Sequence, residues 1–230
     1  MFHISPSFAY LAFALWTALV WLGVYYLLIR SREVQLWMSG WGLIGGPFIN
    51  EFVYVTDFWQ PAGAIPFFPI ESALFGAGFL GILSAVTLEL SGGGYYPEMD
   101  QSVRRSAKIW TLITTVLVAL GAYIAGFNSV ASTAVGLGAG AGMILLSRRD
   151  LWPLLIKGVV ASLIASLATI VVFVFLIAGN AHDLGRELST FYAKHGAGGT
   201  AILLFFWTVA FGAFFGPFYA WAKNLRQIRV

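Results

Sequence analysis

Long apolar stretches, separated by short polar or glycine-rich segments, make up almost the whole chain. A stretch of roughly 20 apolar residues crosses a bilayer as an α-helix, because a helix satisfies its own backbone polar groups. The alternation of apolar and polar residues that is typical of membrane β-strands is absent from the sequence. The pattern therefore predicts an all-α membrane protein of seven transmembrane helices. Their expected residues are 7–29, 36–56, 66–88, 109–127, 130–147, 152–178 and 201–222.

Basic residues distinguish the two ends of the predicted helices. The loops after the first, third and fifth helices, together with the C-terminal tail, hold Arg30, Arg32, Arg104, Arg105, Lys108, Arg148, Arg149, Lys223, Arg226 and Arg229. The loops on the opposite side hold only Arg186 and Lys194. Positive charge concentrates in cytoplasmic loops. We therefore expect the N-terminus outside, the C-terminus in the cytoplasm, and a multi-pass protein of the cell's inner (plasma) membrane.

Composition narrows the classes of function. Hydrophobic residues make up 59% of the chain and charged residues only 10%, whereas a soluble domain carries about 25% charge. The net charge is +3 with no dense basic patch, so nothing indicates a nucleic-acid partner. The absence of cysteine excludes disulfides and thiolate catalysis. All three histidines fall outside the predicted helices, and we expect no metal or haem site in the membrane.

A short internal similarity raises the question of a repeat. Residues 75–81 read Phe-Gly-Ala-Gly-Phe-Leu-Gly, and residues 211–217 read Phe-Gly-Ala-Phe-Phe-Gly-Pro. Small residues at such spacing let membrane helices approach closely. The sequence leaves two alternatives open: one seven-helix domain without internal symmetry, or a single domain built of two related three-helix modules. The modules would be residues 1–90 and 130–230, with 109–127 as a connector helix.

Two carboxyl groups fall within predicted helices. An ionisable group in hydrocarbon costs roughly 2.5–3.5 kcal/mol, so such residues are candidates for function. Glu51 precedes the expected outer end of the second helix by about five residues, and Glu71 follows the start of the third by about five, so both lie roughly 8 Å deep. Two adjacent carboxyls could share a proton and leave one as an acid. Alternatively, Glu51 and Asn50 simply hydrogen-bond a neighbouring helix.

Aromatic residues form 17% of the chain, and many are expected at the membrane interfaces. The deeper ones concentrate on the third and seventh predicted helices. They pack in the core and against lipid, or together they line a slot for a polyene, because rings stack on flat apolar chains and their faces stabilise cations. These deeper aromatics are Phe67, Phe68, Phe75, Phe79, Phe205, Phe206, Trp207, Phe211, Phe214 and Phe215.

Several motifs together resemble the integral-membrane lycopene cyclase domain family of bacteria and archaea, in the manner of its divergent members. They are Leu36-Trp37-Met38-Ser39, Gly46-Pro47, Glu51, Tyr54, Asp57-Phe58-Trp59-Gln60-Pro61, Ile70-Glu71-Ser72-Ala73-Leu74-Phe75-Gly76 and the seventh helix from Trp207 to Tyr219. The resemblance covers most of the chain, and its specific part is about 40 residues. It implies a cofactor-independent isomerase that cyclises a carotenoid. Family members carry an acidic pair at the start of the third helix of each half, and the pair protonates the end of the polyene.

The chain departs from this family pattern. The first acidic pair is reduced to Glu71-Ser72, and the corresponding positions of the second half are Leu203 and Leu204. The candidate catalytic residues are therefore Glu71 and Glu51. The candidate substrate-binding residues are Asp57, Trp59, Phe67, Phe68, Phe75, Trp207 and Phe211.

Two functions follow as hypotheses. In the first, the protein is an enzyme that acts on a carotenoid or another isoprenoid without a cofactor. In the second, it is a non-catalytic subunit that binds a pigment or lipid within a larger membrane complex. A transporter is less well supported, because the repeat would be parallel and intramembrane charges are few.

Overall fold

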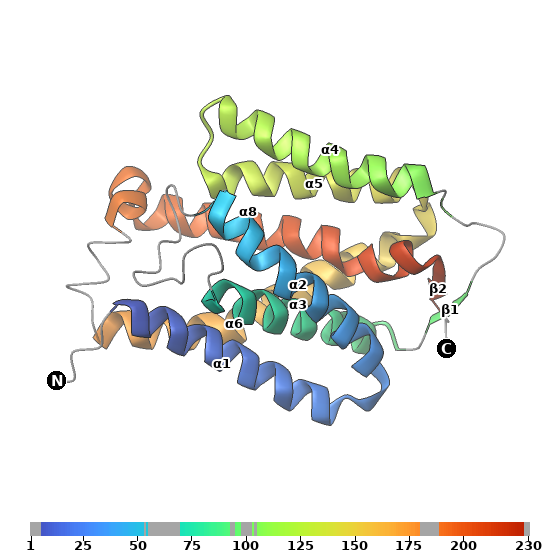
Figure 1. Ribbon diagram of the computed structural model, residues 1–230, viewed down its shortest axis with the longest axis horizontal. Coiled ribbons are helices and arrows are strands. Elements are labelled where there is room, and N and C mark those ends of the chain that lie inside the picture. Colours follow the sequence, from blue (N-terminus) through green and yellow to red (C-terminus); the bar gives the residue numbers. More distant parts are fainter. Residues whose placement is uncertain are drawn as a thin grey trace. The chain divides into compact units, whose positions relative to one another are not determined.

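The computed structural model describes residues 6–52, 54, 70–92, 95–97, 103, 105–179 and 189–227. These residues form seven α-helices, which confirms the expected helical class and number (Figure 1). The helices are α1 (Pro6–Leu27), α2 (Arg32–Phe52), α3 (Ile70–Leu90), α4 (Arg105–Ile124), α5 (Ser129–Ser147), α6 (Trp152–Gly179) and α8 (Ser189–Lys223).

The last helix begins earlier than the sequence predicts. Its apolar stretch of membrane-crossing length, Gly199–Lys223, agrees with the membrane helix expected near 201–222. We expected residues 180–200 to form an outer loop, with a short surface helix possible in its middle. Instead, α8 is continuous over 35 residues from Ser189. No proline interrupts residues 189–200, so nothing in this polar segment stops the helix. Its first turns lack the apolar pattern that predicted the rest of the helix, and their three glycines give them low helix propensity.

Five of the described helical stretches are long and apolar enough to cross a membrane: Ile70–Leu90, Arg105–Ile124, Ser129–Ser147, Arg149–Thr169 and Gly199–Lys223. A sixth arises if Leu11–Leu27 and Ile29–Asn50, which meet at a bend of 106°, count as one broken span. The chain thus has the make-up of a multi-pass membrane protein. The count of seven spans and the orientation stay predictions.

The chain divides into two compact units. Unit 1 comprises residues 1–82 and 165–203, and unit 2 comprises residues 83–164 and 204–230. Three helices, α3, α6 and α8, contribute one part to each unit. This division differs from the sequence modules 1–90 and 130–230, which stay a prediction.

In unit 1, small residues bring α2 and α3 into backbone contact. A Cβ atom added at Gly42 would meet the backbone of Gly76, and one at Gly46 would meet the carbonyl of Ser72. This register makes the two helices antiparallel neighbours. The hydroxyl of Ser39 donates a hydrogen bond to the Ala77 carbonyl oxygen over 2.8 Å and adds a polar contact to the same interface. Only small residues permit such an approach.

In unit 2, α6 and α8 make a similar contact. A Cβ atom at Gly216 would lie 2.7 Å from the Cα atom of Gly158, and one at Gly212 would lie 2.7 Å from the Cβ atom of Ser162. Only some of the glycines of α5 lie in contacts with other helices. Gly136 and Gly140 face other helices, whereas Cβ atoms at Gly138 and Gly142 would have nothing within 4 Å.

Each unit contains a helix pair joined through a single 3₁₀ turn. η1 (Ile29–Ser31) lies between α1 and α2 in unit 1, and η3 (Arg149–Leu151) lies between α5 and α6 in unit 2. At the first junction, the Arg32 guanidinium donates to the carbonyl oxygens of Tyr25 and Tyr26 at 3.0 and 3.2 Å, and it lies 5.1 Å from the centre of the Tyr25 ring. These bonds satisfy carbonyl groups that the end of α1 leaves without helical partners.

A short strand pair corrects the prediction for the segment after α3. We expected residues 91–108 to form a loop long enough to have some structure of its own, with its glycines acting as a flexible linker. Instead, β1 (Tyr95–Pro97) pairs antiparallel with β2 (Leu225–Gln227) after the end of α8 (Figure 1). Alternation cannot reveal strands of three residues, and the pairing joins segments far apart in the sequence.

Candidate functional site

Glu71 lies in the first turn of α3, in unit 1. The residue is only 7% exposed, and its carboxyl oxygen Oε2 has no hydrogen-bond partner among the described residues. A buried carboxyl oxygen without a partner is costly in a protein interior, so such groups are rare, and a catalytic role is one of their explanations. The described part of α3 begins at Ile70, and the expected start of this helix near residue 66 lies outside the described residues.

Two further buried polar side chains lie near the same ends of α2 and α3. Ser72 follows Glu71 in α3, and Asn50 stands one helical turn beyond Gly46, on the face of α2 that meets Ser72. They are 6% and 3% exposed, and Ser72 Oγ and Asn50 Oδ1 have no hydrogen-bond partner in the described part of the chain. Sequence reasoning gave Asn50 and Ser72 no functional role, because only the α2–α3 register brings them together.

A row of phenylalanine rings begins one helical turn from Glu71. Phe75 and Phe79 follow at intervals of four residues, which places all three side chains on one face of α3. The ring centroids of Phe75 and Phe79 are 5.4 Å apart, and those of Phe75 and Phe13 of α1 are 5.3 Å apart, with stacked planes in both pairs. Unit 1 therefore has the Glu71 carboxyl at one end of a row of three stacked phenylalanine rings.

The other candidate residues of this region are described only in part. Glu51 is the last but one residue of α2, so it stands at the end of a helix next to α3, but its side chain lies outside the described part. Asp57, Trp59, Phe67 and Phe68 also lie outside the described residues.

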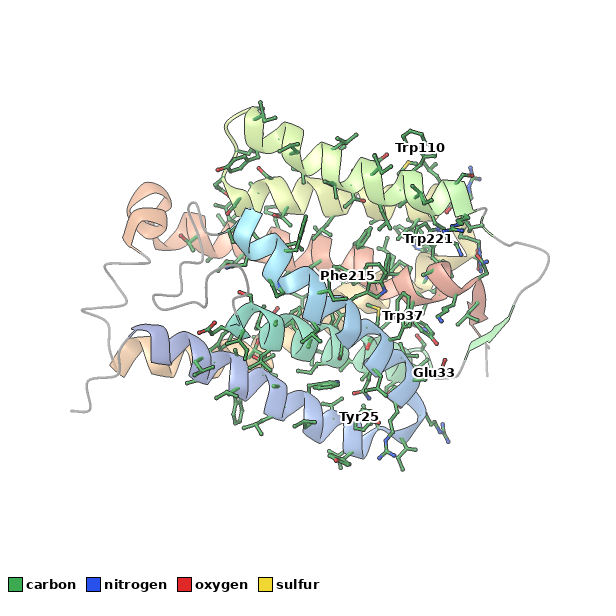
Figure 2. The ribbon with its side chains drawn as sticks, viewed as in Figure 1. Tyr25, Glu33, Trp37, Trp110, Phe215 and Trp221 are labelled. Carbon is green, nitrogen blue, oxygen red and sulfur yellow. The ribbon has the colours of Figure 1, made fainter. Side chains whose placement is uncertain are left out.

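The aromatic residues of α8 form a second, separate series in unit 2. Trp207 and Phe211 have ring centroids 4.8 Å apart, and Phe211 and Phe215 have centroids 4.5 Å apart. Phe205 and Phe206 are 53% and 60% exposed, which agrees with the expected contact with lipid and not with a place in the core. Figure 2 shows Phe215 and Trp221 along α8.

An ion pair between a buried arginine and an exposed aspartate lies at one end of unit 2. The Arg148 side chain is 1% exposed and donates from Nε and Nη2 to the two carboxylate oxygens of Asp150 at 2.7 and 2.6 Å. It also donates to the Leu225 carbonyl oxygen at 3.1 Å, and Trp221 Nε1 donates to Ser147 Oγ at 3.0 Å. These bonds attach the C-terminal segment to the α5–α6 junction. The sequence showed Arg148 only as one of the basic loop residues.

Metal chemistry has no support within the described ranges, where no group of three or more His, Asp or Glu side chains could hold an ion. No family model, curated protein or solved structure matches the chain. The functional argument therefore rests on the geometry around Glu71 and on the motifs.

Proposed function

We propose that the chain is a plasma-membrane protein that binds or acts on a carotenoid or another isoprenoid, in the manner of the lycopene cyclase domain family. The observation that carries the proposal is the buried Glu71 carboxyl at the head of the Phe75, Phe79 and Phe13 rings. An acid in an apolar site beside aromatic faces suits the chemistry of carbocations.

Such a site could run an isomerisation with a complete balance of atoms. The Glu71 carboxyl would give its proton to a terminal alkene carbon, and the resulting cation would be attacked by a neighbouring double bond of the same polyene. A ring C–C bond forms, and loss of a proton from the ring restores both the alkene and the acid. The product is an isomer of the substrate, so no cofactor takes part.

The second half of the chain favours the alternative of binding without catalysis. Glu71 precedes the Phe75-Gly76 pair by four residues, and Trp207 precedes Phe211-Gly212 by four. Aligning the two Phe-Gly pairs makes Trp207 the equivalent of Glu71, one helical turn after Leu203, which the family pattern gives as the equivalent. Neither Leu203 nor Trp207 is an acid. The glycines themselves support the repeat, because Gly76 meets α2 and Gly212 meets α6 in closely similar contacts. One site at most could donate a proton.

Substitution of Glu71 tests the catalytic version. Glu71→Gln keeps the shape of the side chain but cannot act as an acid, so we expect it to abolish ring formation in a host that accumulates lycopene. Glu89→Gln is the matched control, because Glu89 is exposed near the other end of the same helix. The measurements are product analysis by chromatography and the amount of folded protein in the membrane.

Three outcomes distinguish an enzyme from a non-catalytic binding subunit. Ring formation by the wild type and Glu89→Gln but not by Glu71→Gln supports the enzyme. Full ring formation by Glu71→Gln excludes Glu71 as the acid. If the wild type forms no rings but retains a polyene after purification, seen by its absorption spectrum, the protein is a binding subunit.

A further inference from the structure

Within unit 2, the start of α4 is attached to the end of α8. Lys108 Nζ donates a hydrogen bond to the Ala222 carbonyl oxygen over 2.7 Å. The backbone N–H of Val103 donates to Asn224 Oδ1 over 3.0 Å. These two bonds place the first turn of α4 beside the last turn of α8, and both segments belong to the same unit.

Three positive charges lie at this contact, on Arg105, Lys108 and Lys223, and we call these residues the basic corner. Arg105 and Lys223 are exposed. Lys108 is half-buried, and its bond to α8 uses one of the three N–H donors of its ammonium group. The described acidic residues of unit 2 are Glu89, on α3, and Asp150, which already accepts two bonds from an arginine. The basic corner therefore has the charge to attract an anion.

An exposed apolar face runs along α4 from the basic corner. Four exposed apolar residues follow Arg105 at intervals of three or four positions, which places them on the same face of the helix: Ile109, Ile113, Val116 and Leu120. Trp110 is also exposed and stands roughly 8 Å further along the helix than Arg105. Figure 2 shows Trp110 at the same end of unit 2 as Trp221 of α8. A positive charge thus stands at the head of a long apolar surface.

The make-up of this face favours lipid over another helix. Membrane helices that pack together place small residues at their contact. In α4, the small residues Thr115 and Ala119 meet Gly136 and Gly140 of α5. The outward face consists instead of branched and aromatic side chains, and tryptophan is enriched at the level of the lipid headgroups.

We propose that the basic corner and the outer face of α4 bind an acidic phospholipid. The basic side chains hold the phosphate of the headgroup, and an acyl chain lies along the apolar residues that follow Arg105. A free phosphate ion could use only the charge, whereas a phospholipid uses the charge and the apolar face together. The bound lipid contacts both α4 and α8. This site lies in unit 2, so it does not depend on the function proposed for Glu71.

Two lipids with identical chains test the proposal. Dioleoyl phosphatidylglycerol carries a net negative charge, and dioleoyl phosphatidylcholine carries none. Their dissociation constants can be measured by native mass spectrometry on the full chain, purified in an uncharged maltoside detergent. Each Lys or Arg near an acidic lipid contributes about fivefold in affinity. With at least two such charges, we expect the wild type to bind phosphatidylglycerol about 25-fold more tightly than phosphatidylcholine.

Three variants locate the preference. Arg105→Gln and Lys223→Gln should each weaken the binding of phosphatidylglycerol about fivefold and leave that of phosphatidylcholine unchanged. Arg30→Gln is the matched control, because it removes the same charge from an exposed arginine in η1 of unit 1. Its preference should equal that of the wild type. Tryptophan fluorescence in lipid-free detergent verifies that each variant is folded, and the two test variants lie on different helices, so one remains if the other fails.

The remaining results would overturn the proposal. Equal binding of both lipids by the wild type excludes recognition of an acidic headgroup. An equal loss of preference in Arg30→Gln and in the two test variants assigns it to the overall charge of the protein and not to the basic corner. If glycerophosphoglycerol, which is the same headgroup without acyl chains, competes as well as the intact lipid, the corner binds a free phosphate and not a lipid.

Discussion

The backbone contact between α2 and α3 can be tested by adding a single methyl group. Gly42 faces Gly76 across this contact, whereas Gly40, two residues earlier in the same helix, would have nothing within 4 Å of an added Cβ atom. Gly42→Ala and Gly40→Ala therefore make the same chemical change in the same helix. They differ only in what the new methyl group meets.

The structure sets the size of the effect. A Cβ atom at Gly42 would lie 2.7 Å from the backbone nitrogen of Ala77 and nearer still to the carbonyl group of Gly76, so an ordinary contact of about 3.5 Å requires the helices to part by more than roughly 0.8 Å. A gap of this size forfeits about a quarter to a half of each dispersion contact across the interface. Overpacking of this kind costs about 1–3 kcal/mol, and alanine returns about 1 kcal/mol through helix propensity.

The gain in propensity is common to both variants, so it cancels in their difference. We expect Gly42→Ala to be less stable than Gly40→Ala by about 1–3 kcal/mol, with Gly40→Ala at or slightly above the wild type. The assay is denaturant unfolding in detergent, followed by tryptophan fluorescence. Equal free energies of unfolding for the two variants would refute the close contact and, with it, the register that brings Asn50 towards Ser72.

Three further predictions concern the other end of the chain. Asp150→Ala leaves the buried Arg148 guanidinium without its carboxylate, so the free energy of unfolding should fall by about 1–3 kcal/mol, while a control Arg149→Ala should leave it nearly unchanged. Trp221→Phe removes the hydrogen bond to Ser147 and should cost about 1 kcal/mol in the same unfolding assay. A reporter that works only in the cytoplasm should be active when fused after Val230, and activity of an external reporter there would contradict the predicted orientation.

The sequence predicted the helices well because their signal is local. A run of apolar residues long enough to span a bilayer must become a helix, whatever surrounds it. The same reasoning failed for residues 189–200, since a polar helical extension has no apolar run to reveal it. It also failed for β1 and β2, because their pairing depends on two segments that meet only in the folded chain.

The sequence predicted one residue of the candidate site and missed two others. Glu71 was identified because an acidic residue within a long apolar run is recognisable from the sequence alone. Asn50 and Ser72 could not be singled out, because polar neutral residues are common in membrane helices and their significance comes from the register of α2 against α3. The four-residue spacing of Gly42 and Gly46, and of Ser72 and Gly76, was the one signal from which that register could have been inferred.

The unequal burial of the helices has a consequence for sequence variation. Within their apolar windows, 61% of α3 is buried inside the protein, but only 6% of α4. Lipid tails accept any apolar shape, so in a saturation library the exposed positions of α4 should tolerate exchange among Leu, Ile, Val and Phe. Thr115 and Ala119, which meet the glycines of α5, should not tolerate it. In α3, each exchange alters a contact, and only substitutions that conserve volume should survive. The two helices look similarly hydrophobic in sequence, yet we expect the exposed apolar residues of α4 to vary freely in evolution and those of α3 to change little.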